Sequence, residues 1–349
     1  MDLKLIEELT NAFGPSGFEN DVLKVAKKYI KGSTFEDSTN NLYINLPNSK
    51  SDKFRIMIDA HADEVGMMVH HIKPNGTIGF ITLAGIMPAA LIAQKVLIRN
   101  KKGQYITGIV VSKPPHFSSI NDLSNVLTIE DLSIDVGASN SEETEREYKI
   151  GVGCPIVPKT NFEYNEENGI MMAKAFDCRL GCAAAIDVLN TIDNKNIEIV
   201  GTLSSQEEIG IRGANITPRR VLPDIAIVFE GTPADDTILD PPLSQTYLNK
   251  GPMLRHIDKG MITHPRFLAF ALEIANKHNI PVQEAVRTKG ATNGQSIHLN
   301  NLGIPTIVIG IPVRYIHTHH SIASVKDYNN AVILAKAIIN EFDNNKIIL

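Results

Sequence analysis

The chain has few cysteines and aromatic residues, and it lacks long runs of apolar or basic residues. Three cysteines in 349 residues are too few for a disulfide framework, which favours a reducing compartment. No apolar stretch reaches the roughly 20 residues that a membrane-spanning helix needs, and the N-terminal residues 1–4 do not resemble a signal peptide. We therefore expect a cytoplasmic protein with no membrane partner.

The charged residues are nearly balanced, with 34 lysines and arginines against 39 aspartates and glutamates, and no long basic run occurs. Nucleic-acid partners are therefore not expected, because they require a concentrated basic surface. The hydrophobic content of 43% is ordinary for a globular protein, and the length allows about two domains.

Both ends of the chain alternate between helix-like and strand-like segments. The spacing of apolar residues predicts helices over residues 3–12, 19–31, 180–191, 266–279 and 325–342. It predicts strands over residues 41–46, 54–60, 197–205, 225–229 and 306–311. This alternation predicts an α/β fold with a mainly parallel sheet that helices cover.

The middle of the chain differs from both ends in its pattern of apolar residues. It contains short β-rich runs over residues 67–72, 77–83, 95–99 and 105–111, with few helical patterns. Asn75-Gly76 is a typical hairpin turn. We expect an inserted, small β-barrel-like domain over 66–162, and one α/β domain formed by residues 1–65 and 163–349.

Acidic and histidine residues follow four of the predicted buried strands. They form the groups His61-Ala62-Asp63-Glu64, Gln206-Glu207-Glu208, Glu230 and His317-Thr318-His319-His320, and a further acid, Asp177, precedes a predicted helix. Ligands bind beyond the carboxyl ends of strands in open α/β sheets, and the end of a buried strand is a poor place for an unpaired charge. The pattern therefore predicts a metal site.

These residue types suit a pair of divalent cations. Two metal ions about 3.5–4 Å apart need a shared carboxylate, and histidine nitrogen and carboxylate oxygen are suitable ligands. His61 could bind through one ring nitrogen while Asp63 accepts a hydrogen bond from the other. Glu207 and Glu208 are adjacent, so one can bind a metal while the other faces the substrate water.

Six segments in a fixed order cover nearly the whole chain. They are FGPSGFE (13–19), DAHADEVGMMV (59–69), AKAFDCRLGCA (173–183), SQEEIGIRGA (205–214), VFEGTPADD (228–236) and IPVRYIHTHHS (311–321). Together they resemble the M42 metallo-aminopeptidases, the family of glutamyl aminopeptidase-like and tetrahedral aminopeptidase proteins. The resemblance implies a zinc-peptidase-like mixed sheet with an inserted β domain, and an enzyme that removes N-terminal residues from short peptides.

The same resemblance implies two divalent metal ions per subunit, Zn²⁺ or Co²⁺, and a homo-oligomer of dimers assembled into a tetrahedral dodecamer. The implied ligands are His61 and Glu230 for one metal, Glu208 and His317 for the other, and Asp177 as the bridge. It also implies Glu207 as the general base and Asp63 as the support of His61, and it assigns no substrate-binding residue.

The chain departs from the family pattern at two positions. Cys178 stands where the family often has a second acid after the bridging aspartate, and we do not expect it to bind a metal. Asn293 stands in a loop expected near the active site, where the loss of a charge bears on substrate preference.

Several alternatives remain open at this point. A related deacylase or carboxypeptidase would share the metal architecture, and a catalytically weak assembly protein would share the fold. Paired carboxylates also serve glycosidases, although those enzymes seldom need histidine ligands. We expect His319 and His320 to face solvent, and Lys250 and Arg255 to be surface charges rather than binders of an acidic substrate.

Overall fold

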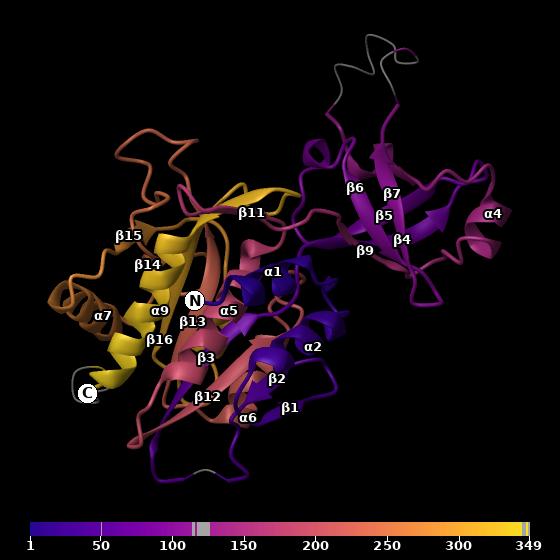
Figure 1. Ribbon diagram of the computed structural model, residues 1–349. Helices are drawn as coiled ribbons and strands as arrows, with labels where there is room; N and C mark the ends of the chain where they lie inside the picture. The colour runs from indigo at the N-terminus through magenta and orange to yellow at the C-terminus, as the bar shows by residue number, and fades with distance from the viewer. Residues whose placement is uncertain (50, 114–115, 117–125, 344–346, 348–349) are drawn as a thin grey trace.

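The computed structural model describes residues 1–349 except residues 50, 114–115, 117–125, 344–346 and 348–349. A helix-covered mixed sheet lies beside a closed β-barrel, and the barrel strands come from the middle of the chain (Figure 1). The predicted α/β fold with an inserted barrel is therefore confirmed. Among the described residues, none of the helices has the length and apolar character needed to cross a membrane.

The large sheet has a parallel centre and antiparallel edges. Its strands are β1 (Thr34–Glu36), β2 (Leu42–Ile44), β3 (Phe54–His61), β10 (Glu163–Asn165), β11 (Ile170–Ala173), β12 (Ile197–Ser204), β13 (Ile225–Pro233), β14 (Met253–Ile257), β15 (Gln283–Val286), β16 (Thr306–Arg314) and β17 (Ser321–Ser324). The order is β1-β2-β12-β3-β13-β16-β17-β11-β10, and β14 pairs with both β15 and β16. Strands β12, β3, β13 and β16 are mutually parallel, so their carboxyl ends meet at one edge.

Helices cover both faces of this sheet. One face carries α1 (Leu3–Asn11), α2 (Asn20–Tyr29), α5 (Phe176–Thr191), α7 (Pro265–Lys277) and α9 (Val325–Asn340). The other face carries the short elements η4 (Gly213–Asn215), α6 (Thr217–Val221) and α8 (Asn293–Ile297). The central strands are mainly apolar, which suits strands with both faces buried.

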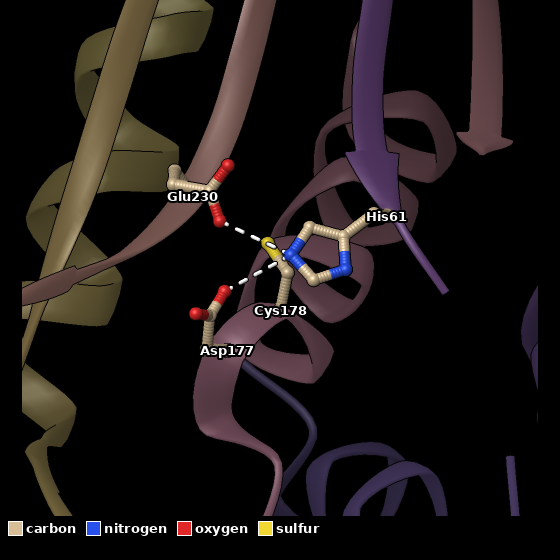
Figure 2. Close-up of side chains that lie close together, drawn as sticks. All are labelled: His61, Asp177, Cys178 and Glu230. Carbon is tan, nitrogen blue, oxygen red and sulfur yellow. Dashed lines mark hydrogen bonds and ion pairs between the residues drawn. The ribbon is translucent and has the colours of Figure 1, made fainter. Parts of the chain in front are cut away.

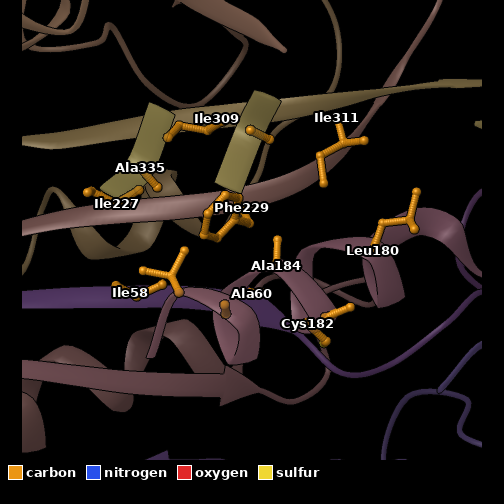
Figure 3. Close-up of a cluster of buried hydrophobic side chains, with 14 of the residues drawn as sticks. Ile58, Ala60, Leu180, Cys182, Ala184, Ile227, Phe229, Ile309, Ile311 and Ala335 are labelled. Carbon is orange, nitrogen blue, oxygen red and sulfur yellow. The ribbon is translucent and has the colours of Figure 1, made fainter. Parts of the chain in front are cut away.

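The main hydrophobic core lies between the sheet and α5 with α9 (Figure 3). In β3, Ile58 and Ala60 face this core, whereas Met57 between them packs into a second core on the opposite face. In α5, Ala184 and its neighbours are fully buried, and their small side chains let the helix lie close to the sheet. This close packing fixes the start of α5 relative to the ends of β3 and β13.

The barrel has its own hydrophobic core. Its strands are β4 (Gly66–Ile72), β5 (Ile78–Leu83), β6 (Lys95–Arg99), β7 (Tyr105–Val111), β8 (Ser133–Asp135) and β9 (Pro155–Pro158), closed in the order β4-β5-β8-β7-β6-β9. Short elements η1 (Pro88–Ala90), η3 (Ile129–Asp131) and α4 (Ser141–Arg146) flank them. Gly76 has a φ of 87° in the turn between β4 and β5, which only glycine adopts without strain.

Candidate metal centre

The predicted site residues gather at the carboxyl ends of the parallel strands. Ser204 at the end of β12 pairs with His61 at the end of β3, so the segments that follow both strands start side by side. Glu230 lies inside β13 rather than after it, because this strand continues four residues beyond the predicted end at Phe229. The start of α5 and the loop after β16 complete the cluster.

The first group consists of His61, Asp177 and Glu230 (Figure 2). The Nε2 atom of His61 is 3.0 Å from Oδ1 of Asp177 and 3.3 Å from Oε1 of Glu230. A side chain at Gly231 would place its Cβ only 2.7 Å from the Cα of Asp177, so the glycine allows this close approach. The three side chains come from β3, α5 and β13, all within the packed α/β core.

The second group shares Asp177 with the first. The Nε2 atom of His317 is 3.3 Å from Oδ2 of Asp177 and 3.4 Å from Oε2 of Glu208. Asp177 therefore presents one carboxylate oxygen to each histidine. A carboxylate that bridges two cations needs this arrangement.

Asp63 connects His61 to the loop that follows β12. Its Oδ1 atom accepts a hydrogen bond from the backbone N–H of Glu207 (2.9 Å), and its Oδ2 atom accepts one from the backbone N–H of Glu208 (3.1 Å). The Nδ1 atom of His61 lies 3.2 Å from the backbone carbonyl oxygen of Asp63 and 3.3 Å from its Oδ1 atom, and the Ser16 hydroxyl donates to Oδ2 at 2.6 Å. Asp63 thus lies beside His61 as predicted, and it also holds both glutamates in place. The contribution of Ser16 was not predicted.

A buried ion cluster supports the end of β3. Both carboxylate oxygens of Glu64 are 2.6 Å from Nζ of Lys174, and one of them is 3.2 Å from Nη2 of Arg179. Nε of Arg179 donates to the carbonyl of Ala62 at 2.9 Å. Breaking a buried ion pair of this kind typically costs about 3–5 kcal/mol, so the cluster fixes the backbone next to His61.

The buried carboxyl groups of the site would be stabilised in their ionised form by a nearby positive charge. Burial raises the pKa of Glu230 to about 8 and the pKa of Glu208 well above its usual value. Burial alone would lower the pKa of His61, but the acidic groups around it outweigh burial and raise its pKa well above the usual value. In the part of the chain that the structure describes, Oε1 of Glu208 and Oε2 of Glu230 are buried without a hydrogen-bond partner. Histidine nitrogens and carboxylate oxygens suit borderline divalent cations, so these residues fit such ions.

A cavity of ≈ 380 Å³ opens directly on these groups. Its lining includes Glu207, Arg255 and Arg287, together with the backbone segment Gly290–Thr292. Burial raises the pKa of Glu207 to about 8. A larger cavity of ≈ 820 Å³, lined in part by Leu222 and Pro305, lies at the amino-terminal ends of β13 and β16, away from the site.

Two predictions about surface residues are wrong. Arg255 is only 5% exposed, because Nη1 donates to Oδ2 of Asp258 at 3.0 Å and Nη2 donates to Thr232 at 3.3 Å. His319 is 2% exposed, and its Nε2 atom lies 2.9 Å from the carbonyl oxygen of Lys95 in the barrel. The predictions for the exposed residues Lys250 and His320 are confirmed.

Asn293 lies beneath the cavity lining rather than within it. It is fully buried at the start of α8, and its Nδ2 atom donates to Oδ2 of Asp59 at 2.7 Å. Thr202 and Ser204 also donate to Asp59, through its other carboxylate oxygen. Asn293 therefore positions the segment Gly290–Thr292 from below, and its position gives no direct contact with a substrate in the cavity.

Cys178 lies next to the first group of ligand candidates (Figure 2). Its sulfur is within 4.8 Å of the ligand atoms of His61, Asp177 and Glu230. The thiol lies 3.3 Å from the carbonyl oxygen of Phe229, to which it donates, and burial raises its pKa well above the usual value. These features are typical of a protonated, buried cysteine.

The family model described as M42 glutamyl aminopeptidase matches residues 40–334. The chain belongs to the M42 family. It is therefore an aminopeptidase, a hydrolase of peptide bonds, from a family of metallopeptidases.

Similar M42 proteins cover this chain almost completely. The glutamyl aminopeptidase of Lactococcus lactis subsp. cremoris is 29% identical over 98% of this chain and 97% of its own length. The lysyl aminopeptidase of Pyrococcus furiosus is 30% identical over 98% of this chain and 97% of its own length. The crystal structure of a TET aminopeptidase from a marine sediment Thaumarchaeota archaeon is 34% identical, covers 99% of this chain and 98% of that one, and superposes with a TM-score of 0.92.

Proposed function

We propose that this M42 aminopeptidase uses two divalent cations, Zn²⁺ or Co²⁺, to remove N-terminal residues from short peptides. The observation that supports two cations is the orientation of Asp177, whose two oxygens face two different histidines. In this proposal His61 and Glu230 hold one cation, His317 and Glu208 hold the other, and Asp177 bridges them. Cations bound there would polarise the carbonyl of the scissile bond and acidify a water molecule.

Glu207 is the general base in this proposal. Its side chain lines the cavity beside the ligand candidates, and burial raises its pKa to about 8. A carboxylate with a raised pKa can accept a proton from the attacking water and deliver it to the leaving amine. Asp63 holds the backbone of Glu207 and the ring of His61, so it fixes the base relative to the first cation.

The size of the cavity supports a preference for short peptides. A volume of ≈ 380 Å³ accommodates only a few side chains beside the reacting groups. We also propose that residues 66–162 form a separate domain with a role in oligomerisation or substrate access, and that the subunits assemble as dimers within a dodecamer. A structurally similar protein, PhTET1, has been crystallised as a dodecamer; at 24% identity and a TM-score of 0.84, its likeness to this chain concerns the fold.

Exopeptidase activity can be tested with matched substrates. Purified protein loaded with Zn²⁺ or Co²⁺ should release amino acids from peptides with a free N-terminal amine and leave N-acetylated copies intact. Equal cleavage of both would contradict an aminopeptidase. Cleavage of acylated amino acids alone would favour a related deacylase instead.

The role of Glu207 can be tested by the substitution Glu207→Gln. Turnover should fall by roughly 10² to 10⁴, the usual contribution of a general base, while metal content stays unchanged. The substitution Glu163→Gln, at an exposed glutamate in β10, is the matched control and should retain full turnover. Retained turnover in Glu207→Gln would remove this residue as the base.

A further inference from the structure

One ligand candidate touches the barrel directly. The Nδ1 atom of His317 lies 3.0 Å from the backbone carbonyl oxygen of Gly85, which belongs to the loop between β5 and η1. The opposite ring nitrogen, Nε2, faces Asp177 and Glu208. A histidine that binds a cation through Nε2 carries its proton on Nδ1, so Nδ1–H can donate to this carbonyl.

The barrel core fixes the position of this carbonyl. Ile86, the residue after Gly85, is buried in the barrel core together with Phe80 and Leu91. The N–H of Ile86 also donates to the carbonyl of Ala84 at 3.1 Å, which makes the loop tight. The acceptor for His317 is thus part of the barrel's packed structure.

A second contact joins the same two regions two residues further along. The Nε2 atom of the buried His319 is 2.9 Å from the carbonyl oxygen of Lys95, at the start of β6. This carbonyl also accepts a hydrogen bond from the backbone N–H of Lys159, so its position is set by the barrel. The loop after β16 is therefore attached to the barrel at both His317 and His319.

The backbone of His317 needs such attachment. Its φ is 62°, in the left-handed region that a residue with a side chain seldom occupies. Its side chain is 33% exposed, whereas the side chain of His61 is 1% exposed. The hydroxyls of Thr318 and Ser321 both donate to the carbonyl of Tyr315, at 2.7 Å and 3.1 Å, and so shape the backbone of this loop. The orientation of the half-exposed ring is set by the contacts that the ring itself makes.

We propose that the inserted barrel completes the second metal site by holding His317 in its ligating orientation, through the carbonyl of Gly85 and the His319–Lys95 hydrogen bond. The inference rests on the proposed two-cation site. Gly85 and His319 act as positioning residues, since neither faces Asp177 or Glu208 with a ligand atom. Among the described residues, His61, Asp177 and Glu230 make no hydrogen bond to the barrel, and the first site shares only Asp177 with the second. A loosened barrel contact should therefore weaken the second cation's binding more than the first.

Calorimetric titration of the metal-free full-length protein with Zn²⁺ tests this proposal. His319→Phe keeps a ring but removes the N–H, and it should weaken one binding step about 10- to 100-fold, the usual effect of losing such support. The other step should change less than about twofold. His319→Gln retains an N–H donor at similar reach and should bind both cations with nearly wild-type affinity.

A second variant changes the support of the Gly85 loop within the barrel core. Ile86→Ala removes the side chain that anchors Gly85 and should weaken the same step as His319→Phe. Ile134→Ala is its matched control, because Ile134 lies in the same core but pairs with Ile78, at the end of β5 remote from Gly85. His320→Ala, at the exposed neighbour of His319, is a further control and should leave both binding steps unchanged. Circular dichroism and thermal melting show which variants are folded.

The outcomes separate this inference from the proposed function. Folded His319→Phe and Ile86→Ala proteins with two unchanged binding steps would overturn the inference, as would equal weakening of both steps. His319→Gln as weak as His319→Phe would also overturn it, because the hydrogen bond would not be the cause. A wild-type protein that binds two cations and cleaves no peptide would contradict the proposed function and leave the inference standing.

Discussion

The two halves of the candidate metal centre are built in different ways. His61 and Glu230 lie within β3 and β13, and both side chains are almost fully buried. Glu208 and His317 lie in loops after β12 and β16, and His317 is 33% exposed. The first half is therefore held by the packed sheet. The second half depends on hydrogen bonds from the backbone N–H of Glu208 to Asp63 and from the ring of His317 to the carbonyl of Gly85 beside the barrel.

This difference leads to an expected order of affinity. A site whose ligands are held by a packed core binds a cation with little loss of conformational freedom, whereas a loop ligand has to be ordered on binding. We therefore expect a tight site at His61 and Glu230 and a weaker site at Glu208 and His317. The predictions below test this contrast, starting with the largest effect.

Asp177→Ala should weaken cation binding in both halves and so remove the difference in affinity between them, because both halves share this side chain. Metal content should fall in both sites, and turnover should drop by at least about 10³, as is usual when several electrostatic contacts to a reacting centre are lost. Elemental analysis and peptide hydrolysis measure the two effects. Asp193→Asn, at an exposed aspartate, is the control. Unchanged content of both metals in Asp177→Ala would rule out the bridge.

Glu230→Gln and Glu208→Gln should each affect the cation binding of one half only. The first should weaken the tight binding step and the second the weaker step, each by roughly 10- to 100-fold, because an amide is a poorer ligand for a cation than a carboxylate. Calorimetric titration with Zn²⁺ distinguishes the steps. If both variants lost the same step, the assignment of one glutamate to each half would be wrong.

Asn293→Asp should produce the smallest effect, through its buried contact with Asp59 in β3. Burial raises the pKa of Asp59 to about 6, so its native pKa exceeds that of the unfolded chain. This shift stabilises the fold at low pH, and the stabilisation is lost as the pH rises towards about 6. A second carboxyl next to Asp59 would have to share a proton with it.

The expected loss of unfolding free energy for Asn293→Asp is therefore roughly 2 kcal/mol or more at pH 8, and less at pH 5. Urea denaturation at both pH values measures it. Asn301→Asp, at an exposed position, is the control and should have little effect at either pH. Equal losses at pH 5 and pH 8 for Asn293→Asp would contradict a shared proton.

Much of the first half could be predicted from the sequence. The mainly apolar run before His61 and the run before Glu207 mark strands buried on both faces, and acids or histidines at their ends indicate a ligand site. These are local patterns. They predict that His61, Asp63 and the pair Glu207-Glu208 lie at one edge of the sheet.

The rest depends on contacts between distant segments. The partners of His317 and His319 are backbone carbonyls of the barrel, more than 220 residues away, and a backbone carbonyl leaves no pattern in a sequence. Arg255 is an exception, because its partner Asp258 is only three residues away. Two opposite charges at this spacing are as typical of an exposed surface as of a buried pair, so the sequence predicts a surface charge there. In the large sheet, the sequence does not predict the short strands β1, β10, β11, β14, β15 and β17, because runs of three to five residues are too short to show a period.

The most direct test of the two-cation centre is a crystal structure of the zinc-loaded protein, with anomalous diffraction measured at the zinc edge. We predict two anomalous peaks in each subunit. One should lie among His61, Asp177 and Glu230, and the other among Asp177, Glu208 and His317, with lower occupancy at limiting zinc. A single peak per subunit, or peaks away from these side chains, would contradict the account.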